Sequence, residues 1–378
     1  MIPAKTRQND SVSIHPRSSG ERVLLVSVAT LYGGAETYYV KLAEILRRQY
    51  HVAAIVFDPT LAHEFQRLGV QTQYFDGAQS RYATAIYALI TTLRDFCPDL
   101  IHLNGQAEAY LALPLALDQI PVIITRHTPL ADVYLGAGSQ IPVPLKRFLV
   151  VQSHRRAEHI VCVSRYLHSQ LALYIPSKKL STIHTWLAAD KTDPARLWDS
   201  PPTPLKVLFA GRVVRSKGIF DLVEALRGVS GVRLDIVGNG PDLDEAKLIS
   251  NGLPVTFHGF QRDCIPFYFG ADLLVFPSHE GFEGLPQVPL EAMCAGLPCL
   301  SSDINAVKEL VADEFPSALF RTANVEDLKE KLEFFRDNPQ SLNELSQAGI
   351  ERVRASFLES SVSSKYLKLF HDVMNASR

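Results

Sequence analysis

Basic residues, Arg212 and Lys217 among them, lie in a glycine-rich turn in the second half of the chain, within residues 210–218 (AGRVVRSKG). The apolar run before this turn predicts a buried strand, which places Arg212 at the strand end and Lys217 where the next helix begins. Two cations that converge there could bind a diphosphate and stabilise it as a leaving group. A solvated charged turn is the alternative, and the flanking glycines, Gly211 among them, weigh against it.

Three acidic residues follow another predicted buried strand, within residues 277–291 (PSHEGFEGLPQVPLE). Pro289 fits the first position of a helix, so we expect Glu291 in the first helical turn, where an acid complements the helix dipole. Glu283 has no such simple explanation, because it lies between glycine-rich loop segments. A carboxylate in such a loop can bind sugar or ribose hydroxyls by charge-assisted hydrogen bonds.

Two loops of the first half could also contact a ligand. Gly33 and Gly34 follow the first strand, where paired glycines allow close backbone approach and a helix N-terminus attracts anions. A tight turn in which Glu36 only complements the dipole is the alternative. Another predicted strand ends in Arg126 and His127, which places a guanidinium and an imidazole at the cleft edge, although a lone histidine is as often structural.

A further glycine turn follows the second strand of the second half, at residues 237–241 (VGNGP). Gly238 and Gly240 would let this turn lie against a base or a ribose. The turn is not a dinucleotide-binding fingerprint, because it lacks the third glycine and does not follow the first strand of its domain.

The segments between these loops are continuously apolar runs that alternate with amphipathic helical segments. These segments must position the loops. Such runs are typical of strands buried on both faces of a parallel sheet. They occupy residues 22–29, 51–57, 99–105, 121–127, 159–164, 206–211, 232–238, 254–259, 272–277 and 298–302. The pattern predicts an α/β chain of two Rossmann-like, doubly wound domains with a cleft between them, where ligands bind beyond the carboxyl ends of the strands.

The order of these segments predicts the domain limits. We expect a flexible N-terminus at 1–20, a first domain at 21–190, a proline-rich connection at 191–205 and a second domain at 206–355. We expect residues 356–378 to form a helix that crosses back to the first domain.

Composition excludes several classes of protein. The chain has 378 residues, 47% hydrophobic and 21% charged, which excludes disordered, collagen-like and disulfide-scaffold chains. A net charge of −2 does not favour nucleic-acid binding. Residues 1–190 carry 18 basic and 14 acidic side chains and the remainder carries 20 and 26, so the two halves differ in sign. The five cysteines have no C-x-x-C pair, which predicts reduced, buried thiols.

No secretory signal or membrane-spanning run is evident, so we expect a cytoplasmic protein that is at most peripheral to the membrane. The segment 146–156 carries Lys146, Arg147, His154, Arg155 and Arg156 among apolar residues. It could face an anionic membrane or a lipid-diphosphate acceptor, and a solvated helix face is the alternative.

With these motifs in hand, the chain resembles the retaining, nucleotide-sugar-dependent glycosyltransferases of family four, the glycosyl transferases group 1, which have the GT-B fold. The resemblance spans residue 22 to the C-terminus and rests on the loops at 33–36, 211–218 and 238–241 and on the family's Glu–seven residues–Glu motif. Glu280 lies eleven residues before Glu291, but Glu283 lies eight before it, so we assign Glu283 and Glu291 to the motif.

The resemblance implies roles for these residues. Arg212 and Lys217 would bind the donor diphosphate, Glu283 the transferred sugar and Glu291 the ribose. His127 would reach the donor sugar across the cleft. The remaining donor-binding positions would be loop and backbone contacts at Gly33, Gly34, Gly211, Gly238, Gly240, Gly284 and Leu285. Ser164 matches a serine near the hinge, and we assign no nucleophile.

The resemblance implies no cofactor, with the nucleotide-diphosphate sugar as co-substrate and a sugar, lipid-linked or other hydroxyl as acceptor. It also implies no metal. Asp242-Leu243-Asp244 spells the metal signature of the other glycosyltransferase fold, but here helix capping is the better interpretation. One departure from the family is residues 183–190 (IHTWLAAD), where an Asn-Gly turn is frequent.

The motifs are compatible with three functions. The first is a retaining, metal-independent hexosyltransferase of polysaccharide, lipid-linked glycan or glycoconjugate biosynthesis. The second is a GT-B sugar-nucleotide epimerase, which would turn over the donor without an acceptor. The third is a non-catalytic subunit that binds a nucleotide sugar. The nucleotide base and the sugar are not determined by these motifs.

Overall fold

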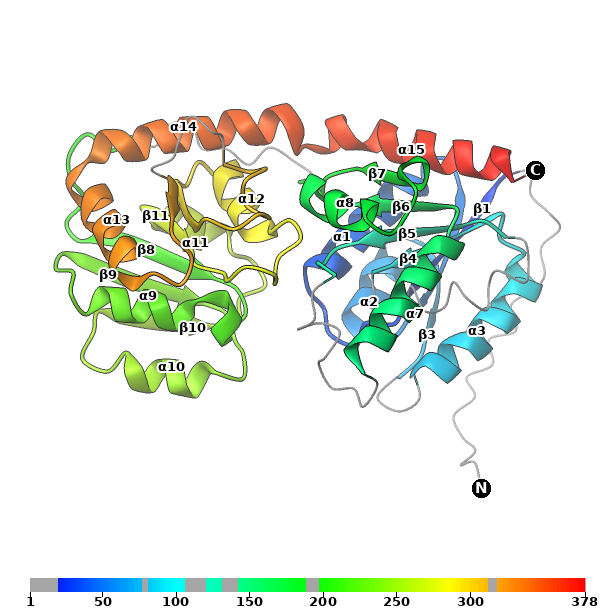
Figure 1. Cartoon of the computed structure of the whole chain (residues 1–378), viewed down its shortest axis with the longest axis horizontal. Coiled ribbons are helices and arrows are strands. Elements are labelled where there is room, and N and C mark those ends of the chain that lie inside the picture. The colour runs from blue at the N-terminus through cyan, green and yellow to red at the C-terminus, as the bar shows by residue number, and fades with distance from the viewer. Residues whose placement is uncertain are drawn as a thin grey trace, which may run out of the picture.

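The computed structural model describes residues 20–76, 81–105, 120–130, 142–187, 197–311 and 318–377. Two parallel sheets lie side by side, each covered by helices, and two long C-terminal helices run across both of them (Figure 1). The expected α/β architecture of two Rossmann-like domains is therefore confirmed.

The first sheet has seven strands in the order β3-β2-β1-β4-β5-β6-β7, and every pair is parallel. The order reverses between β1 and β4, and the loops that leave these strands diverge to open a crevice. The strands are β1 Arg22–Ser27, β2 His51–Val56, β3 Gln71–Tyr74, β4 Leu100–Asn104, β5 Val122–Arg126, β6 His159–Cys162 and β7 Leu180–Thr182. Its helices are α1 Gly34–Leu46, α2 Pro59–Arg67, α3 Arg81–Phe96, α7 Val143–Arg156, α8 Arg165–Ala172 and the short η1 Ser177–Lys179.

The second sheet repeats this plan with six parallel strands in the order β10-β9-β8-β11-β12-β13. The strands are β8 Leu205–Ala210, β9 Val232–Val237, β10 Val255–Gly259, β11 Leu273–Phe276, β12 Cys299–Ser302 and β13 Leu319–Phe320. The helices are η2 Arg215–Lys217, α9 Ile219–Leu226, α10 Leu243–Ile249, α11 Ile265–Gly270, α12 Gln287–Cys294, α13 Val325–Asp337 and α14 Pro339–Ser356.

The predicted strands all form, and most of them are apolar and buried on both faces, whereas the edge strand β10 is only partly buried. Every residue of β4, β5, β11 and β12 is buried. The short strands β3, β7 and β13 were not predicted from the sequence. They are two to four residues long, and β3 (QTQY) is polar, so they carry no clear apolar signal.

The C-terminal helix α15, Glu359–Ala376, packs on the first domain, whereas α14 lies over the second (Figure 1). One apolar side chain of α15 per helical turn faces inward. These four side chains are fully buried in a core that also includes residues of α1, and they are Val362, Tyr366, Phe370 and Met374. Helix α15 follows α14 in sequence and therefore connects the second domain to the first. The domain limits stated above stay a prediction.

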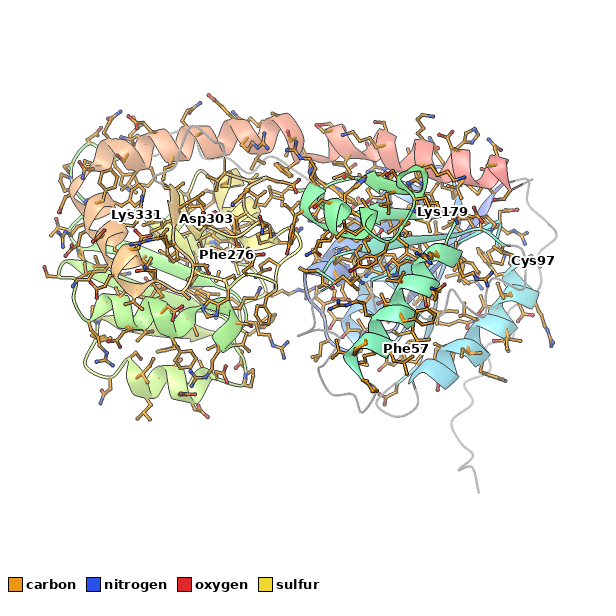
Figure 2. All side chains as sticks on the ribbon, viewed as in Figure 1. Phe57, Cys97, Lys179, Phe276, Asp303 and Lys331 are labelled. Carbon is orange, nitrogen blue, oxygen red and sulfur yellow. The ribbon has the colours of Figure 1, made fainter. Side chains whose placement is uncertain are left out.

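Parts of the predicted connection lie outside the described residues, as do the N-terminal residues 1–19. Of the connection, Trp198 is buried in the core of the second domain, where its indole Nε1 donates to Asp272 Oδ1 at 3.1 Å. The expectation for the cysteines is wrong in part: Cys162, Cys294 and Cys299 are buried, but Cys97 is exposed (Figure 2).

No helix of the described residues combines the length and apolar character needed to cross a membrane.

Candidate functional site

Glycine-bearing loops meet at the carboxyl ends of β8, β9 and β11. A Cβ on Gly238 would lie 1.8 Å from Gly211 O, and one on Gly240 would lie 2.1 Å from Val213 O. A Cβ on Gly218 would lie 1.9 Å from Pro277 O. These loops therefore pack backbone against backbone, which only residues without a side chain allow. The structure brings together the 211–218, 238–241 and 277–287 segments that the sequence analysis singled out.

Lys217 and Glu283 form an ion pair at this junction, between Nζ and Oε1. Ser278 Oγ donates to the same carboxylate oxygen at 2.7 Å, and Glu283 is only 8% exposed. Lys217 Nζ also lies 5.8 Å from the centre of the ring of Phe276, the last residue of β11. Figure 2 labels Phe276. A buried carboxylate of this kind must be paired or hydrogen-bonded, and here Lys217 and Ser278 satisfy it.

Arg212 lies in the same loop as Lys217, five residues before it, but has different surroundings. Its side chain is exposed and has no hydrogen-bond or ion-pair partner among the residues that the structure describes. Arg212 is thus available to an anion from solution, whereas the charge of Lys217 is balanced by Glu283.

The first domain contacts the segment that follows Glu283. A Cβ on Gly284 would lie 1.9 Å from the carbonyl oxygen of His127, and one on Gly34 would lie 3.5 Å from Gln287 Cγ. Leu285, beside Gly284, is buried at the same boundary. The structure therefore places Gly34 and His127 directly against the segment that follows Glu283.

His127 is held by the polar end of β4. Its Nε2 lies 2.9 Å from Asn104 Oδ1, and its ring meets the ring of Tyr38 edge-on, with centroids 4.6 Å apart. Burial, and secondarily the charge of Arg126, lower the pKa of His127 to about 3, so the imidazole is neutral at physiological pH.

The guanidinium of Arg126 is not at the cleft edge, which corrects the expectation. Arg126 is 1% exposed, and its Nη2 donates to Pro129 O at 3.1 Å inside the first domain. Arg126 is the last residue of β5 and its side chain is buried within the sheet layer, whereas His127 belongs to the loop that follows the strand.

The loop at Gly33 continues directly into α1, with Gly33 as its N-cap. Glu36 lies in the first turn of this helix and is buried. Burial raises its pKa to about 7, although hydrogen bonds from the backbone N–H groups of Glu36 and Gly33 act in the opposite direction.

Glu291 lies on helix α12, which follows the loop that carries Glu283. Helix α12 begins at Gln287, so Pro289 is its third residue rather than its first and Glu291 lies beyond the first turn, contrary to expectation. The Glu291 carboxylate instead accepts a hydrogen bond from Tyr268 at 2.9 Å. Pro286, with extended backbone, stands at the N-cap of α12 and makes no side-chain capping hydrogen bond.

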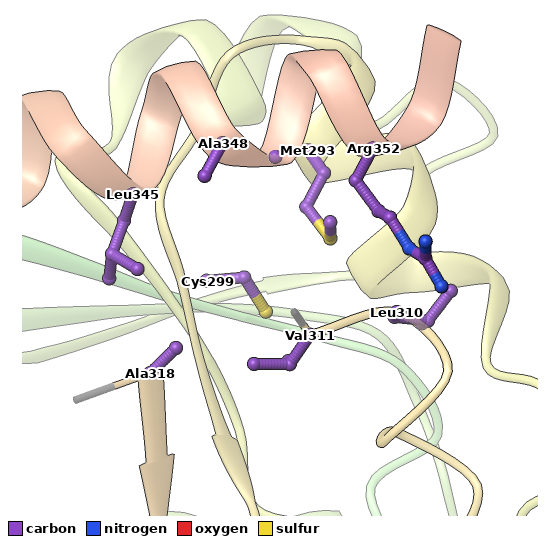
Figure 3. Close-up of a pocket in the computed structure, with 9 residues that line it drawn as sticks. Met293, Cys299, Leu310, Val311, Ala318, Leu345, Ala348 and Arg352 are labelled. Atoms are coloured by element: carbon purple, nitrogen blue, oxygen red, sulfur yellow. The ribbon is translucent and has the colours of Figure 1, made fainter. Parts of the chain in front are cut away.

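Glu291 lines a cavity of about 300 Å³ between the domains, which is large enough to admit part of a nucleotide. Its walls come from α1 on one side and from α11, α12 and the loop before α11 on the other. They include Thr37, Lys41, Arg262, Cys264, Tyr268 and Glu291. A second cavity, behind α12 and beneath α14, has only about 30 Å³ and apolar walls that include Met293, Cys299 and Leu345 (Figure 3). That one is a gap in packing rather than a ligand site.

Two other residues that the sequence singled out, Ser164 and Asp242, have structural roles. Ser164 caps α8, where its Oγ accepts from Leu167 N at 3.2 Å. Asp242 stands at the N-cap of α10 but does not cap it, because its Oδ2 accepts from Arg215 N at 2.8 Å. Within the described residues no cluster of three or more His, Cys, Asp or Glu side chains could hold a metal ion.

The divergent segment at 183–190, described as far as residue 187, contacts the second domain through His184. Its Nε2 lies 2.8 Å from Glu309 Oε2, and Tyr166 N donates to Glu309 Oε1 at 2.9 Å. Glu309 is 7% exposed, and its pKa is lowered by these hydrogen bonds against the opposing effect of burial. The segment thus carries a polar contact between the domains.

The segment 146–156 forms most of α7, and one of its five basic residues, His154, is not on the surface. His154 is fully buried, its Nδ1 lies 2.7 Å from Val150 O, and burial lowers its pKa to about 3. Arg155 and Arg156 are exposed, as are Leu145 and Phe148, on the outer side of the helix.

The sequence analysis missed Asn104, Ser278 and Tyr268, each of which contacts a proposed site residue. Asn104 ends β4, the strand beside β1 at the crevice. The rule that ligands bind at such strand ends could have identified it. Ser278 and Tyr268 carry no comparable signal, because their contacts depend on how loops and helices pack.

Comparison with known proteins identifies the class. The model of the Glycosyltransferase Family 4 group matches residues 32–191, and that of the glycosyl transferases group 1 matches residues 192–352. The two matches adjoin and together span both domains. The chain therefore belongs to the group 1 glycosyltransferases and has the GT-B fold.

Individual relatives are more distant. The chain is 24% identical over 251 residues to the lipopolysaccharide core biosynthesis glycosyltransferase LpsD of Rhizobium meliloti, covering 62% of this chain and 73% of that protein. It is 25% identical over 273 residues to the putative teichuronic acid biosynthesis glycosyltransferase TuaC of Bacillus subtilis, covering 70% and 68%. Among solved structures, HepE of Anabaena in complex with UDP and glucose has a TM-score of 0.79 at 17% identity, covering 93% of this chain and all of that one.

Proposed function

We propose that the protein is a retaining glycosyltransferase of glycan biosynthesis that transfers a sugar from a nucleotide-diphosphate donor to a hydroxyl acceptor without a metal ion. The observation that carries this proposal is the Lys217–Glu283 pair on a loop that also presents exposed Arg212, with His127 against Gly284 on the facing domain. The structures similar to this chain include one with UDP and glucose bound, which supports a nucleotide-sugar donor.

The charges suggest how the donor would be held. A diphosphate between Arg212 and Lys217 would be neutralised by two cations, and its departure as a leaving group would be assisted in the same way. Binding would draw Lys217 toward the phosphates and leave the Glu283 carboxylate, still held by Ser278, to accept from sugar hydroxyls. Glu291 and its cavity would take the ribose side of the nucleotide. We assign no nucleophile.

Substitution of the ion pair tests the assignment. Lys217→Ala and Glu283→Ala are each expected to reduce transfer at least a hundredfold, because each removes a charge that contacts the donor. Lys368→Ala, on the outer face of α15, is the matched control and should leave transfer unchanged. Full activity of either site variant would contradict the proposal.

The donor is identified first by a thermal-shift screen of UDP-, GDP- and ADP-sugars, since a ligand of the native state raises the unfolding midpoint. The same preparations then distinguish the other functions. Turnover of the donor alone would indicate an epimerase, and binding without turnover in any acceptor extract would indicate a non-catalytic subunit.

Membrane contact through α7 is part of this proposal. The exposed side chains of Leu145, Phe148, Arg155 and Arg156 combine apolar and basic character on one helix. Such a surface suits an anionic bilayer that presents a lipid-linked acceptor. Sedimentation with vesicles that contain anionic lipid should deplete the protein, and Phe148→Ser with Arg155→Ser should abolish the depletion.

A further inference from the structure

Asn104 connects the two parts of the first domain that face the second. Its Nδ2 donates to the carbonyl oxygen of Ala35 at 3.1 Å, and its Oδ1 lies 2.9 Å from Nε2 of His127. The side chain is 3% exposed at the end of β4. The side-chain amide of Asn104 therefore connects the glycine loop that begins α1 to the histidine that follows β5.

The orientation of this amide follows from its partners. A carbonyl oxygen such as that of Ala35 only accepts, so the amide group that faces it must be the NH₂ donor. The Oδ1 of Asn104 must then face His127, and this oxygen also only accepts. The hydrogen bond between them requires a proton on Nε2 of His127.

The ring of His127 is also fixed by packing. Tyr38 meets it edge-on at 4.6 Å, and the Tyr38 hydroxyl is itself held by Tyr366 at 2.7 Å and Thr125 at 2.9 Å. A neutral imidazole with its proton on Nε2 has its lone pair on Nδ1. Among the described residues, Nδ1 of His127 has no hydrogen-bond partner.

We propose that Asn104 is a positioning residue that holds His127 as the Nε2–H tautomer, so that Nδ1 accepts a hydrogen bond from a hydroxyl of the donor sugar. Through its hydrogen bond to Ala35 O, the Asn104 amide also fixes the Gly33–Gly34 loop in position relative to Nδ1 of His127. This inference deepens the proposed function and rests on it for the identity of the ligand, but the tautomer itself does not depend on activity.

Nitrogen NMR of the wild-type protein tests the tautomer. With ¹⁵N-labelled histidine at neutral pH, the His127 ring should show a protonated, pyrrole-type Nε2 and an unprotonated, pyridine-type Nδ1. The His127→Gln variant lacks these signals and so assigns them. The reverse pattern, or an imidazolium at neutral pH, would overturn the proposal, and this measurement needs no change at position 104.

Kinetics of Asn104→Leu test the positioning role. The isosteric side chain removes both hydrogen bonds, so we expect a mixture of His127 tautomers and a fall in kcat of about tenfold to a hundredfold. Ser153→Ala, which removes a buried hydrogen bond of α7 in the same domain, controls for lost stability and should leave kcat and the tautomer unchanged.

The two outcomes separate this proposal from the function on which it rests. Wild-type kcat in Asn104→Leu, with active wild-type enzyme, would overturn the positioning role. If the wild-type protein transfers no sugar from any donor, the proposed function fails, whereas the NMR result still decides the tautomer.

Discussion

Glu36 shows how burial alone can alter the chemistry of a residue. Its position in the first turn of α1 suggests an ordinary acid that complements the helix dipole. In the folded protein the side chain is 6% exposed, and burial raises its pKa from 4.5 to about 7. The native state therefore binds this proton more tightly than the unfolded chain does.

This difference predicts the pH dependence of stability. As the pH rises from about 4.5 to about 7, the unfolded chain ionises Glu36 before the native state does, so the free energy of unfolding falls by about 3 kcal/mol. Glu36→Gln, which cannot ionise, should be more stable than the wild type at about pH 8 and equal to it at about pH 4. Urea unfolding at both pH values measures this, with the exposed Glu44→Gln as the control. A stability difference that does not change with pH would contradict it.

At the scale of elements, glycines set how closely the loops of the two domains approach. The segment after β11 contacts the end of β5 because Gly284 has no side chain at the point where its backbone meets the His127 carbonyl. A Cβ at position 284 would collide with the carbonyl oxygen of His127, a backbone atom that cannot rotate away as a side chain can.

Gly284→Ala should therefore separate the domains by enough to misplace His127 relative to Glu283. A displacement of about 1 Å in a reaction centre can reduce the rate about a hundredfold, and we expect a loss of that order in kcat. Gly270→Ala is the matched control, because a Cβ there meets no atom within 4 Å. Equal transfer rates for the two variants would show that this contact does not govern the site.

At the scale of the whole molecule, the two domains are held by contacts that lie far apart in sequence. Arg262 of the second domain pairs with Glu64 of the first at 2.6 Å, and Glu309 contacts His184 at 2.8 Å. Exposed pairs such as Arg262–Glu64 contribute little by themselves. The larger contribution comes from α15, whose buried face belongs to the core of the first domain.

Phe370→Ala should destabilise the first domain by roughly 3–5 kcal/mol, the usual loss for a buried phenylalanine. Lys365→Ala, on the exposed side of the same helix, should have little effect. Hydrogen exchange of the β1 amides reports on the first domain directly, which matters because a chain of two domains need not unfold in one step. Unchanged exchange in β1 would mean that α15 does not stabilise that sheet.

Charge at this scale is a poor guide to binding. The second part of the chain is the more acidic one, yet it carries Arg212 and Lys217, the cations proposed to hold an anionic donor. A site of this kind depends on the few charges within hydrogen-bonding range rather than on the net charge of a domain.

The sequence by itself determined most of the strands, their alternation with helices and the loops that are proposed to carry chemistry. Strands buried on both faces have a continuous apolar pattern, and the glycine turns that follow them are local features as well. For the same reason Lys217, Glu283 and His127 could be selected as candidates. The weak strands β3, β7 and β13 were missed because they are too short to show a pattern.

Only the tertiary structure decided which of these residues meet. The pairing of Lys217 with Glu283 and the amide of Asn104 between Ala35 and His127 join segments distant in sequence. The burial of Arg126 and His154 likewise appears only once the elements pack. Such contacts depend on the packing of whole elements and on the approach of one domain to the other. Neither residue type nor spacing along the chain contains that information.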